Sequence, residues 1–236
     1  MGKNIEFSPE LEVYELLEVY PKPATAFIPE WYKKMPQHSF PDIDDPIITK
    51  TGDANATAKM CVPVLDILTS GYIFSTPADV QVSNHPDQHR LSWSTTFSIV
   101  GMHPTGQIPG MPTLVGHEGV PYRWKGTYAI KTPPGYSVLV MHPVYRNDLP
   151  FTTLSAVVDT DRYSFSSISF PFFLKEGFEG IIPKGTPVAQ IIPFKREGWG
   201  HTINKYNPNI TNGVNILNST ITRSYKTRFW SKKKYQ

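Results

Sequence analysis

Prolines limit what this chain can fold into more than any other feature of its sequence. They number 23 in 236 residues, which is about twice the usual protein share of roughly 5%. Proline breaks the interior of a helix, and in a sheet it is confined to edges, ends and bulges. The sequence therefore predicts short strands joined by rigid loops, with helices reduced to short pieces.

Short runs rich in β-branched and aromatic residues, bounded by Gly, Pro and Asn, indicate strands from about residue 60 onward. Among them are "KMCVPVLDIL", "GYIFSTPADVQV", "GYSVLVMHPVY" and "VAQIIPFKR". Residues 154–161, "LSAVVDTD", are predicted to form a buried strand that ends in two acids, and residues 178–194 a hairpin that turns at Lys184 and Gly185. This many short strands with few helices predict an all-β fold, either a sandwich or a distorted barrel.

Three stretches differ in composition, and we expect them to be separate parts. Residues 1–58 are interpreted as an N-terminal extension of short helices and loops, with a helical turn at "PEWYKKMP". Residues 59–200 are the predicted β-rich core, whose irregular loop at 101–121 is long enough to be functional or to cover another subunit. Residues 201–236 are a basic extension that we expect to pack on the core.

The charge balance does not by itself indicate a nucleic-acid partner, because the formal net charge is only +3. The basic residues gather in "RSYKTRFWSKKKYQ" at the C-terminus, which contains no acid. Such a segment is either a solvated terminus or a contact for phosphate or another anionic surface. No run approaches the ~18 apolar residues of a membrane span, and the acidic, mixed N-terminus shows no signal peptide. We therefore expect a cytoplasmic setting and no membrane partner.

Four motifs in the C-terminal half follow one another in an informative order. Pro133-Pro134-Gly135 enters a strand, Pro143 follows that strand, "VVDTD" ends at Asp161, and "GTPVAQII" occupies 185–192. In this order and spacing, residues 130–196 resemble the dUTPase-like β-clip family. The resemblance implies a β-clip core and a homo-oligomer, commonly a trimer.

The resemblance also implies site residues. The first aspartate of the family's acid pair abstracts a proton from the attacking water, a role that would fall on Asp159 in a nucleotide pyrophosphatase-like hydrolase. His142 and Arg146 flank the position of the family's phosphate loop. If Arg146 converges with the acid pair, the three bind an anionic ligand through a bidentate guanidinium. The alternative is an Arg–Asp pair that pins a strand crossing. The candidate catalytic residues are Asp159 and Asp161, and the candidate ligand-binding residues are His142, Arg146, Tyr163 and Gln190.

The sequence departs from the family pattern where hydrolysis needs it. Arg162 separates the second aspartate from Tyr163, which in a strand would turn the ring to the opposite face. "PVYR" at 143–146 lacks the glycine and serine that let backbone amides surround phosphate, and "SGYIF" at 70–74 lacks the acid that would help to hold magnesium. We therefore expect a non-enzymatic structural or interaction platform without a cofactor. The alternative is a nucleotide-like ligand site or an altered hydrolase, which would use Mg²⁺.

A second resemblance covers more of the chain. "KPATAFIPEWYKKMP", "KMCVPVLDILTSGYI", "TPPGYSVLVMHP", "VVDTDRY" and "FWSKKKY" are together similar to an uncharacterised family of proteins from tailed phages of cyanobacteria. The resemblance implies a viral origin, a location in the host cytoplasm or the virion, and a virion or host protein as partner.

Two further patterns have both a functional and a structural interpretation. His85 and His89 are four residues apart with Asp87 between them, a spacing that on a helix can share a zinc ion. Pro86 favours a turn instead, with the histidines on the surface. Cys61 is the only cysteine, and its apolar neighbours predict a buried, inert thiol.

Overall fold

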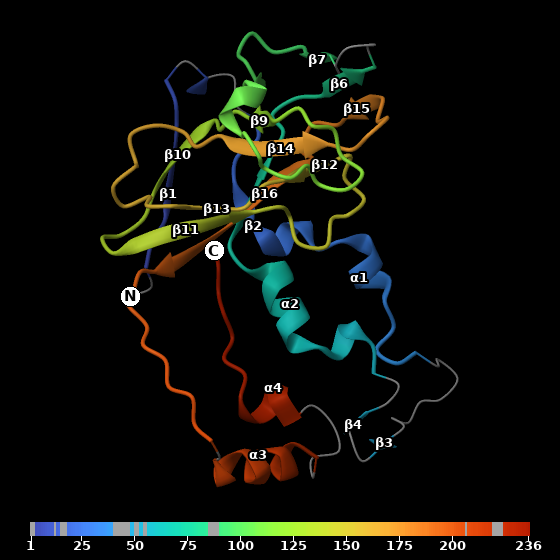
Figure 1. Cartoon of the computed structure of the whole chain (residues 1–236), viewed down its shortest axis with the longest axis vertical. Helices are drawn as coiled ribbons and strands as arrows, with labels where there is room; N and C mark the ends of the chain where they lie inside the picture. The colour runs from blue at the N-terminus through green and yellow to red at the C-terminus, as the bar shows by residue number, and fades with distance from the viewer. Residues whose placement is uncertain are drawn as a thin grey trace. The chain divides into compact units, whose positions relative to one another are not determined.

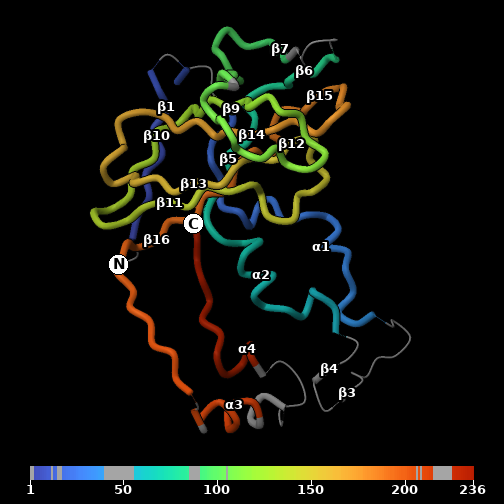
Figure 2. Tube along the Cα trace, viewed as in Figure 1, coloured from blue at the N-terminus to red at the C-terminus, as the bar shows by residue number. Residues whose placement is uncertain are grey.

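The computed structural model describes residues 3–11, 13–14, 18–39, 48–49, 52–53, 56–84, 90–205, 207–218 and 224–236. Contacts divide the chain into two compact units, whose elements are drawn in Figures 1 and 2. The first unit consists of Met1–Phe27 and Gly71–Arg196, and the second of Ile28–Ser70 and Glu197–Gln236. The N-terminal residues thus belong to the same unit as the β-rich segment. The division at residues 58 and 200 stays a prediction.

The largest sheet of the first unit has the strand order β13-β11-β16-β5-β2. The central strand β16 pairs with β11 from Lys195↔Tyr136 to Gln190↔Met141, and with β5 on its other side. Its first half is buried on both faces, as the unbroken apolar run "PVAQII" predicts. The five strands span Ala156–Val158, Tyr136–Met141, Pro187–Lys195, Tyr72–Ser75 and Lys22–Pro23.

Three smaller sheets complete the first unit, with the orders β12-β14-β9-β8, β15-β6-β7 and β1-β10. Every pairing in the described residues is antiparallel, and no sheet closes into a barrel. The predicted mainly β fold is confirmed. In the order just given, the strands span Phe151–Thr153, Phe170–Leu174, Tyr122–Trp124, Val100–Met102, Gly180–Ile182, Val80–Ser83, Arg90–Trp93, Glu6–Pro9 and Tyr128–Lys131, and the 3-10 turns span Ala24–Phe27 and Thr105–Gln107.

Aromatic rings join the two larger sheets into a sandwich-like core. Phe74 of β5 meets Phe170 of β14 edge-on, with ring centroids 5.1 Å apart. Phe172 of β14 stacks on Trp124 of β9 at 4.4 Å, and Phe151 packs against both rings. Burial of one such side chain contributes roughly 1.5–3 kcal/mol, so the cluster stabilises the core, and its Phe74–Phe170 contact links the two sheets.

One glycine allows an unusually close approach of two strands. Gly71 enters β5 with φ +73°, and a Cβ built on it would lie 1.9 Å from the carbonyl oxygen of Ile191 in β16. Its own carbonyl oxygen accepts a hydrogen bond from the Ala24 amide at 2.9 Å. Only glycine fits both the left-handed conformation and the contact.

Two strand predictions in the first unit are wrong. Residues 178–194 do not form a hairpin, because β15 pairs with β6 whereas β16 pairs with β11 and β5. The turn that separates them is nevertheless present, since the Thr186 amide donates to the Pro183 carbonyl at 3.1 Å. The strand that precedes the two acids, β13, lies at the edge of its sheet and is not buried, and its Val157 side chain is 61% exposed.

The second unit contains the described helices. The helical turn expected at "PEWYKKMP" is confirmed as α1, Glu30–Lys34. "KMCVPVLDIL" does not form a strand: its first residues end a 3-10 turn, and its last seven begin the helix α2, Val62–Thr69. Its proline stands in the first helical turn, where a missing N–H costs nothing. Cys61 directly precedes α2 and is exposed, so the predicted burial is wrong. The remaining helices are α3, Pro208–Asn218, and α4, Ser224–Arg228. The unit also contains the short strands β3, Ile48–Thr49, and β4, Gly52–Asp53, and a 3-10 turn at Ala58–Met60.

Side chains anchor the C-terminal segment within the second unit. The indole N–H of Trp230 donates to both carboxylate oxygens of Asp66 on α2, at 3.0 and 2.9 Å. Lys233 Nζ reaches the same carboxylate at 2.5 Å. Within the described ranges, no helix has both the length and the apolar character needed to cross a bilayer.

Candidate functional site

The acid pair predicted from the sequence follows β13, where this edge strand ends in a turn. The amides of Arg162 and Tyr163 donate to the Asp159 carbonyl oxygen at 3.0 and 2.8 Å and close the turn. Thr160, between the two acids, is fully buried, and its hydroxyl hydrogen-bonds the Thr132 hydroxyl at 2.7 Å. The turn therefore holds both carboxylates in defined positions.

Arg196 binds the Asp161 carboxylate through two parallel hydrogen bonds. It directly follows β16, and its Nη1 donates to Oδ1 at 2.8 Å while its Nη2 donates to Oδ2. The amide of Gly135, in the turn between β10 and β11, donates to Oδ2 at 2.8 Å. Only 7% of the Asp161 side chain is exposed. These charge-assisted bonds join the end of β13 to the end of β16 and the start of β11.

Asp159 belongs to the same network but is held less completely. Its Oδ1 accepts a hydrogen bond from the Ser137 hydroxyl at 2.6 Å and lies 3.1 Å from Nη1 of Arg196. Ser137 is fully buried and also accepts a bond from that guanidinium at 2.8 Å. The Asp159 side chain is 49% exposed. Of the two carboxylates, it is therefore the one that solvent or a ligand could reach.

The same contacts keep both carboxylates ionised. Hydrogen bonding to Arg196, assisted by the Gly135 amide, lowers the pKa of Asp161 to about 2 against the opposing effect of burial. The Ser137 hydroxyl, and after it the charge of Arg196, lowers the pKa of Asp159. A general base works best when its pKa lies near the operating pH. The arrangement therefore suits an ionised structural clamp better than a proton acceptor.

Arg146 lies apart from the acid pair. Its Nε and Nη2 donate to the two carboxylate oxygens of Asp148 at 2.8 Å each. Strand β11 separates the two groups: Ser137 is near its start and His142 follows its end, a span of about 16 Å at about 3.3 Å per residue. The convergence of Arg146 with the acid pair, one of the two alternatives considered from the sequence, does not occur within one chain. The alternative interpretation was an Arg–Asp pair that joins strands. Such a pair is present, but its arginine is Arg196, bound to Asp161, and not Arg146.

His142 is committed to the turn that follows β11. Its Nδ1 accepts the Thr153 amide at 3.2 Å, so Nε2 carries the proton and donates to the Arg146 carbonyl at 3.1 Å. Burial lowers the pKa of His142, and the nearby cations of Lys175 and Arg146 act in the same direction. The imidazole is therefore neutral at pH 7 and braces the turn, where it has no free nitrogen for a ligand.

The other two predicted ligand-binding residues also have structural contacts. Gln190 is 2% exposed, and its Oε1 accepts the Val144 amide at 3.1 Å, which links β16 to the turn after β11. Tyr163 is at the surface, with its ring 4.8 Å from that of Phe165. The structure thus brings Asp159 and Asp161 together with Arg196, and His142 and Gln190 together with the 143–146 turn.

No group of three or more His, Cys, Asp and Glu side chains in the described residues could hold a metal ion. His85 and His89 lie outside the described residues. His117, in the long loop, contacts the Val115 carbonyl through Nδ1 at 3.0 Å and the Thr152 hydroxyl through Nε2 at 2.9 Å. Both of its ring nitrogens therefore have partners.

Sequence reasoning missed Arg196 and Ser137. Two signals could have found them: a serine that interrupts the apolar run of β11, and an arginine directly after the long apolar run of β16. The register Ser137↔Phe194, which no local pattern gives, places both beside the acid pair. No protein-family model matches the chain, and no curated protein matches it.

Proposed function

We propose that this protein is a non-enzymatic interaction platform, in which the first unit is a β frame that holds surfaces for other protein chains. The observation that carries the proposal is the use of the acid pair. Both carboxylate oxygens of Asp161 accept hydrogen bonds, from Arg196 and Gly135. The pKa of Asp159 is lowered. Neither carboxylate is therefore suited to accept a proton from water at neutral pH. At the 143–146 turn, His142 is neutral and both of its ring nitrogens are hydrogen-bonded, which also argues against a catalytic site there.

Exposed apolar side chains on β13 and in the segment after it support a protein partner. Val157 on β13 is 61% exposed. Farther along the chain, Phe165 is 79% exposed and its ring lies 4.8 Å from that of Tyr163. Exposed apolar surface of this kind is typical of protein–protein contacts. We propose copies of this same chain as the first partner, which agrees with the homo-oligomer, commonly a trimer, that the β-clip resemblance implies. Association with a virion or a host protein belongs to the proposal through the phage-family resemblance.

The catalytic part of the proposal is tested by incubating the protein with a panel of nucleoside triphosphates and Mg²⁺. We expect no phosphate or pyrophosphate release and no change in melting temperature. A ligand at 100 times its Kd would add about 2.7 kcal/mol, or roughly 5–10 °C for a unit of this size. Hydrolysis, or a shift of that size that Asp159→Asn abolishes, would contradict the proposal.

That contrary outcome would favour the second candidate, a nucleotide-like ligand site, for which the half-exposed Asp159 side chain is the supporting observation.

The proposed self-association is tested separately, by light scattering after size exclusion. We expect a mass that is a multiple of the protomer, reduced by the pair Val157→Glu and Phe165→Glu. Monomers at every concentration would refute self-association, and absence of the chain from the peptides of purified virions would refute the virion association.

A further inference from the structure

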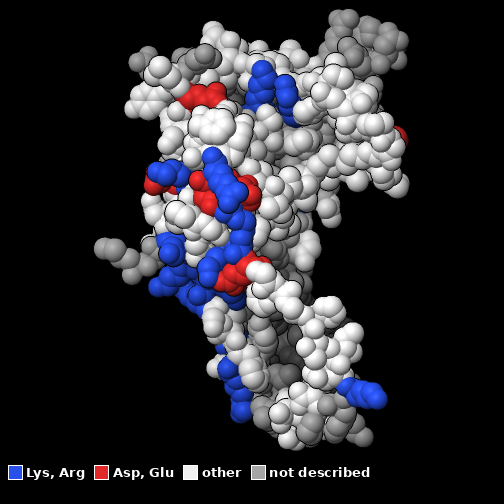
Figure 3. Space-filling model, turned by 60° about the vertical axis from the view of Figure 1, so that its left-hand side comes forward, with Lys and Arg blue, Asp and Glu red and all other residues white. Residues whose placement is uncertain are grey.

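The basic residues of this chain are distributed unevenly. Residues 197–236 contain seven Lys and Arg against a single Glu, a net charge of +6, whereas the whole chain carries +3. The first 196 residues are therefore net acidic by three charges. In Figure 3 the region of the helices that Figure 1 labels α3 and α4 presents basic side chains and no acidic one to the viewer. The positive charge of the protein is thus concentrated in residues 197–236.

The end of this basic segment is held in place. Trp230 and Lys233 both bind the carboxylate of Asp66 on α2. The Asp66 side chain is 18% exposed. The Phe229 amide donates to the Tyr225 carbonyl at 3.0 Å, so the helical turn of α4 continues to this residue. An anchored segment loses less conformational entropy on binding than a free tail does.

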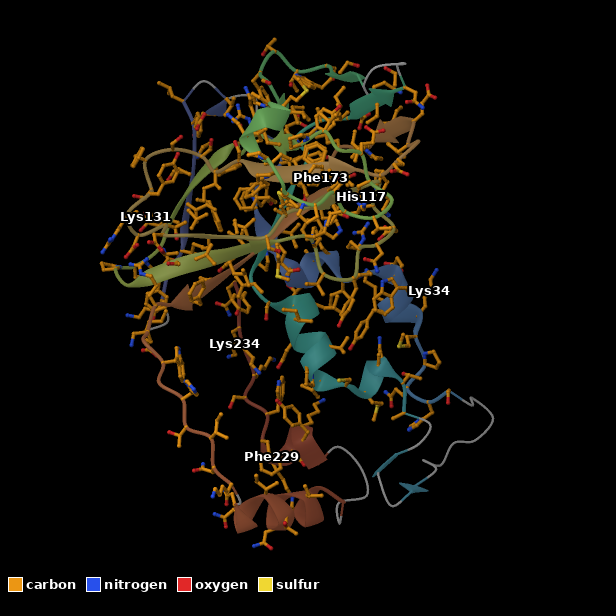
Figure 4. All side chains as sticks on the ribbon, viewed as in Figure 1. Lys34, His117, Lys131, Phe173, Phe229 and Lys234 are labelled. Carbon is orange, nitrogen blue, oxygen red and sulfur yellow. The ribbon has the colours of Figure 1, made fainter. Side chains whose placement is uncertain are left out.

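Four cations of the segment have no ion-pair or hydrogen-bond partner within the described part of the chain. They are exposed and come from α4 and the extended residues after it: Lys226, Arg228, Lys232 and Lys234. Tyr225 directly precedes these cations in the sequence, and Phe229 lies between Arg228 and Lys232. Tyr225 is 45% and Phe229 54% exposed, and positions four apart in a helical turn face the same side. Figure 4 labels Phe229 beside α4 and Lys234 on the extended segment.

We propose that this C-terminal basic surface, formed by Tyr225, Lys226, Arg228, Phe229, Lys232 and Lys234, binds single-stranded nucleic acid. Cations neutralise successive phosphates, and exposed rings stack on bases without regard to sequence. Interleaved lysines, arginines and aromatic rings provide both. The proposal is independent of the platform function of the first unit.

An anionic membrane is the competing partner, and the distribution of charge argues against it. A helix that lies in a membrane interface carries its Lys and Arg on the polar face opposite its apolar face. The long helix of the unit, α3, has the sequence "PNITNGVNILN", with exposed Ile210 and Val214 but no charged residue. The cations lie instead beside two half-exposed rings, which is the arrangement that a base-stacking surface needs.

The test is fluorescence anisotropy of the full chain with a labelled oligodeoxythymidine of about 20 nucleotides. We expect a Kd on the order of 10 µM at low salt, because non-specific binding of this kind is salt-dependent and is weaker, about 1–100 µM or above, at physiological salt. Four phosphate contacts on a single strand give a slope of about −2.8 in a plot of log affinity against log salt, so affinity falls about 50-fold between about 50 and 200 mM salt.

Matched variants separate this surface from general charge. The quadruple variant Lys226→Gln, Arg228→Gln, Lys232→Gln, Lys234→Gln should abolish binding. The control Lys22→Gln, Lys34→Gln, Lys125→Gln, Lys131→Gln removes four exposed charges elsewhere and should retain affinity within about two-fold. Phe229→Ala should weaken binding at least about five-fold, the lower end of the contribution of one stacked base. Phe165→Ala, an exposed ring of the first unit, should leave it unchanged.

Three results would overturn the proposal. The first is no binding of the oligonucleotide at low salt. The second is equal loss of affinity in the two quadruple variants. The third is binding to phosphatidylcholine vesicles that contain a quarter phosphatidylserine in the absence of oligonucleotide binding. If duplex DNA bound as tightly as the single strand, and Phe229→Ala bound the single strand as tightly as the wild type, then the Phe229 ring would have no stacking role.

Discussion

Three glycine-to-alanine substitutions separate the two reasons why a position requires glycine. Gly177 has φ +69° with open space around a built Cβ, Gly126 has no positive φ but a Cβ 2.1 Å from the Ile168 carbonyl oxygen, and Gly71 combines both features. A left-handed conformation costs an L-residue roughly 1–2 kcal/mol. We therefore expect Gly177→Ala to lower the free energy of unfolding by about 1 kcal/mol.

The close contact is more costly because a backbone has to move. The Cβ at Gly71 would overlap the Ile191 oxygen, 1.9 Å away, and β5 can retreat only by lengthening its pairing with β16 and its bond to Ala24. Overpacking of this kind costs typically 1–3 kcal/mol. Gly126→Ala should therefore cost about 2 kcal/mol, and Gly71→Ala about 3–4 kcal/mol when the conformational penalty is added.

Urea unfolding followed by far-ultraviolet circular dichroism measures the three losses in free energy of unfolding. Thermal unfolding gives a second readout: for a unit of roughly 150 residues, 1 kcal/mol lowers the melting temperature by about 2–4 °C. Gly71→Ala should therefore melt about 10 °C below the wild type. If Gly71→Ala were no more destabilising than Gly177→Ala, the close approach of β5 to β16 would be refuted.

Three further predictions concern titratable groups. The Asp161 pKa is lowered in the folded state to about 2, so its stabilising contribution is present above the ordinary value near 3.8 and is lost as the pH falls toward 2. The difference in melting temperature between wild type and Asp161→Asn should therefore shrink over that window. Burial lowers the His142 pKa, so the unfolded state takes up a proton first. Stability should fall as the pH drops below about 6.5, and less so in His142→Gln. Cys61 is exposed, so Ellman's reagent should titrate one thiol in the native protein, and a thiol that reacts only in denaturant would contradict the structure.

Most of the fold class could be predicted, because it depends on patterns that are local in sequence. Proline spacing and short apolar runs indicated strands, and the unbroken "PVAQII" indicated a strand buried on both faces. The same local reasoning misassigned "KMCVPVLDIL", since a short apolar run fits a strand or a buried helical turn equally well. The proline in the first turn was the signal that favoured the helix.

Pairing between distant segments could not be predicted. A glycine turn at Lys184–Gly185 suggested a hairpin, yet the strands on either side join different sheets, because pairing is decided by contacts with β6, β5 and β11. The same limit applies to the site. The acid pair was visible in the sequence, but its partner is determined by the register of β16 on β11. That register brings Arg196, and not Arg146, to Asp161.

The most direct test of the account is a double-mutant cycle between Asp161 and Arg196, measured by thermal unfolding. Coupled groups give non-additive effects. We predict that Asp161→Asn and Arg196→Gln each lower the melting temperature, and that the double variant melts close to the less stable single variant. Additive losses, or single variants as stable as the wild type, would show that the two side chains do not form a structural clamp.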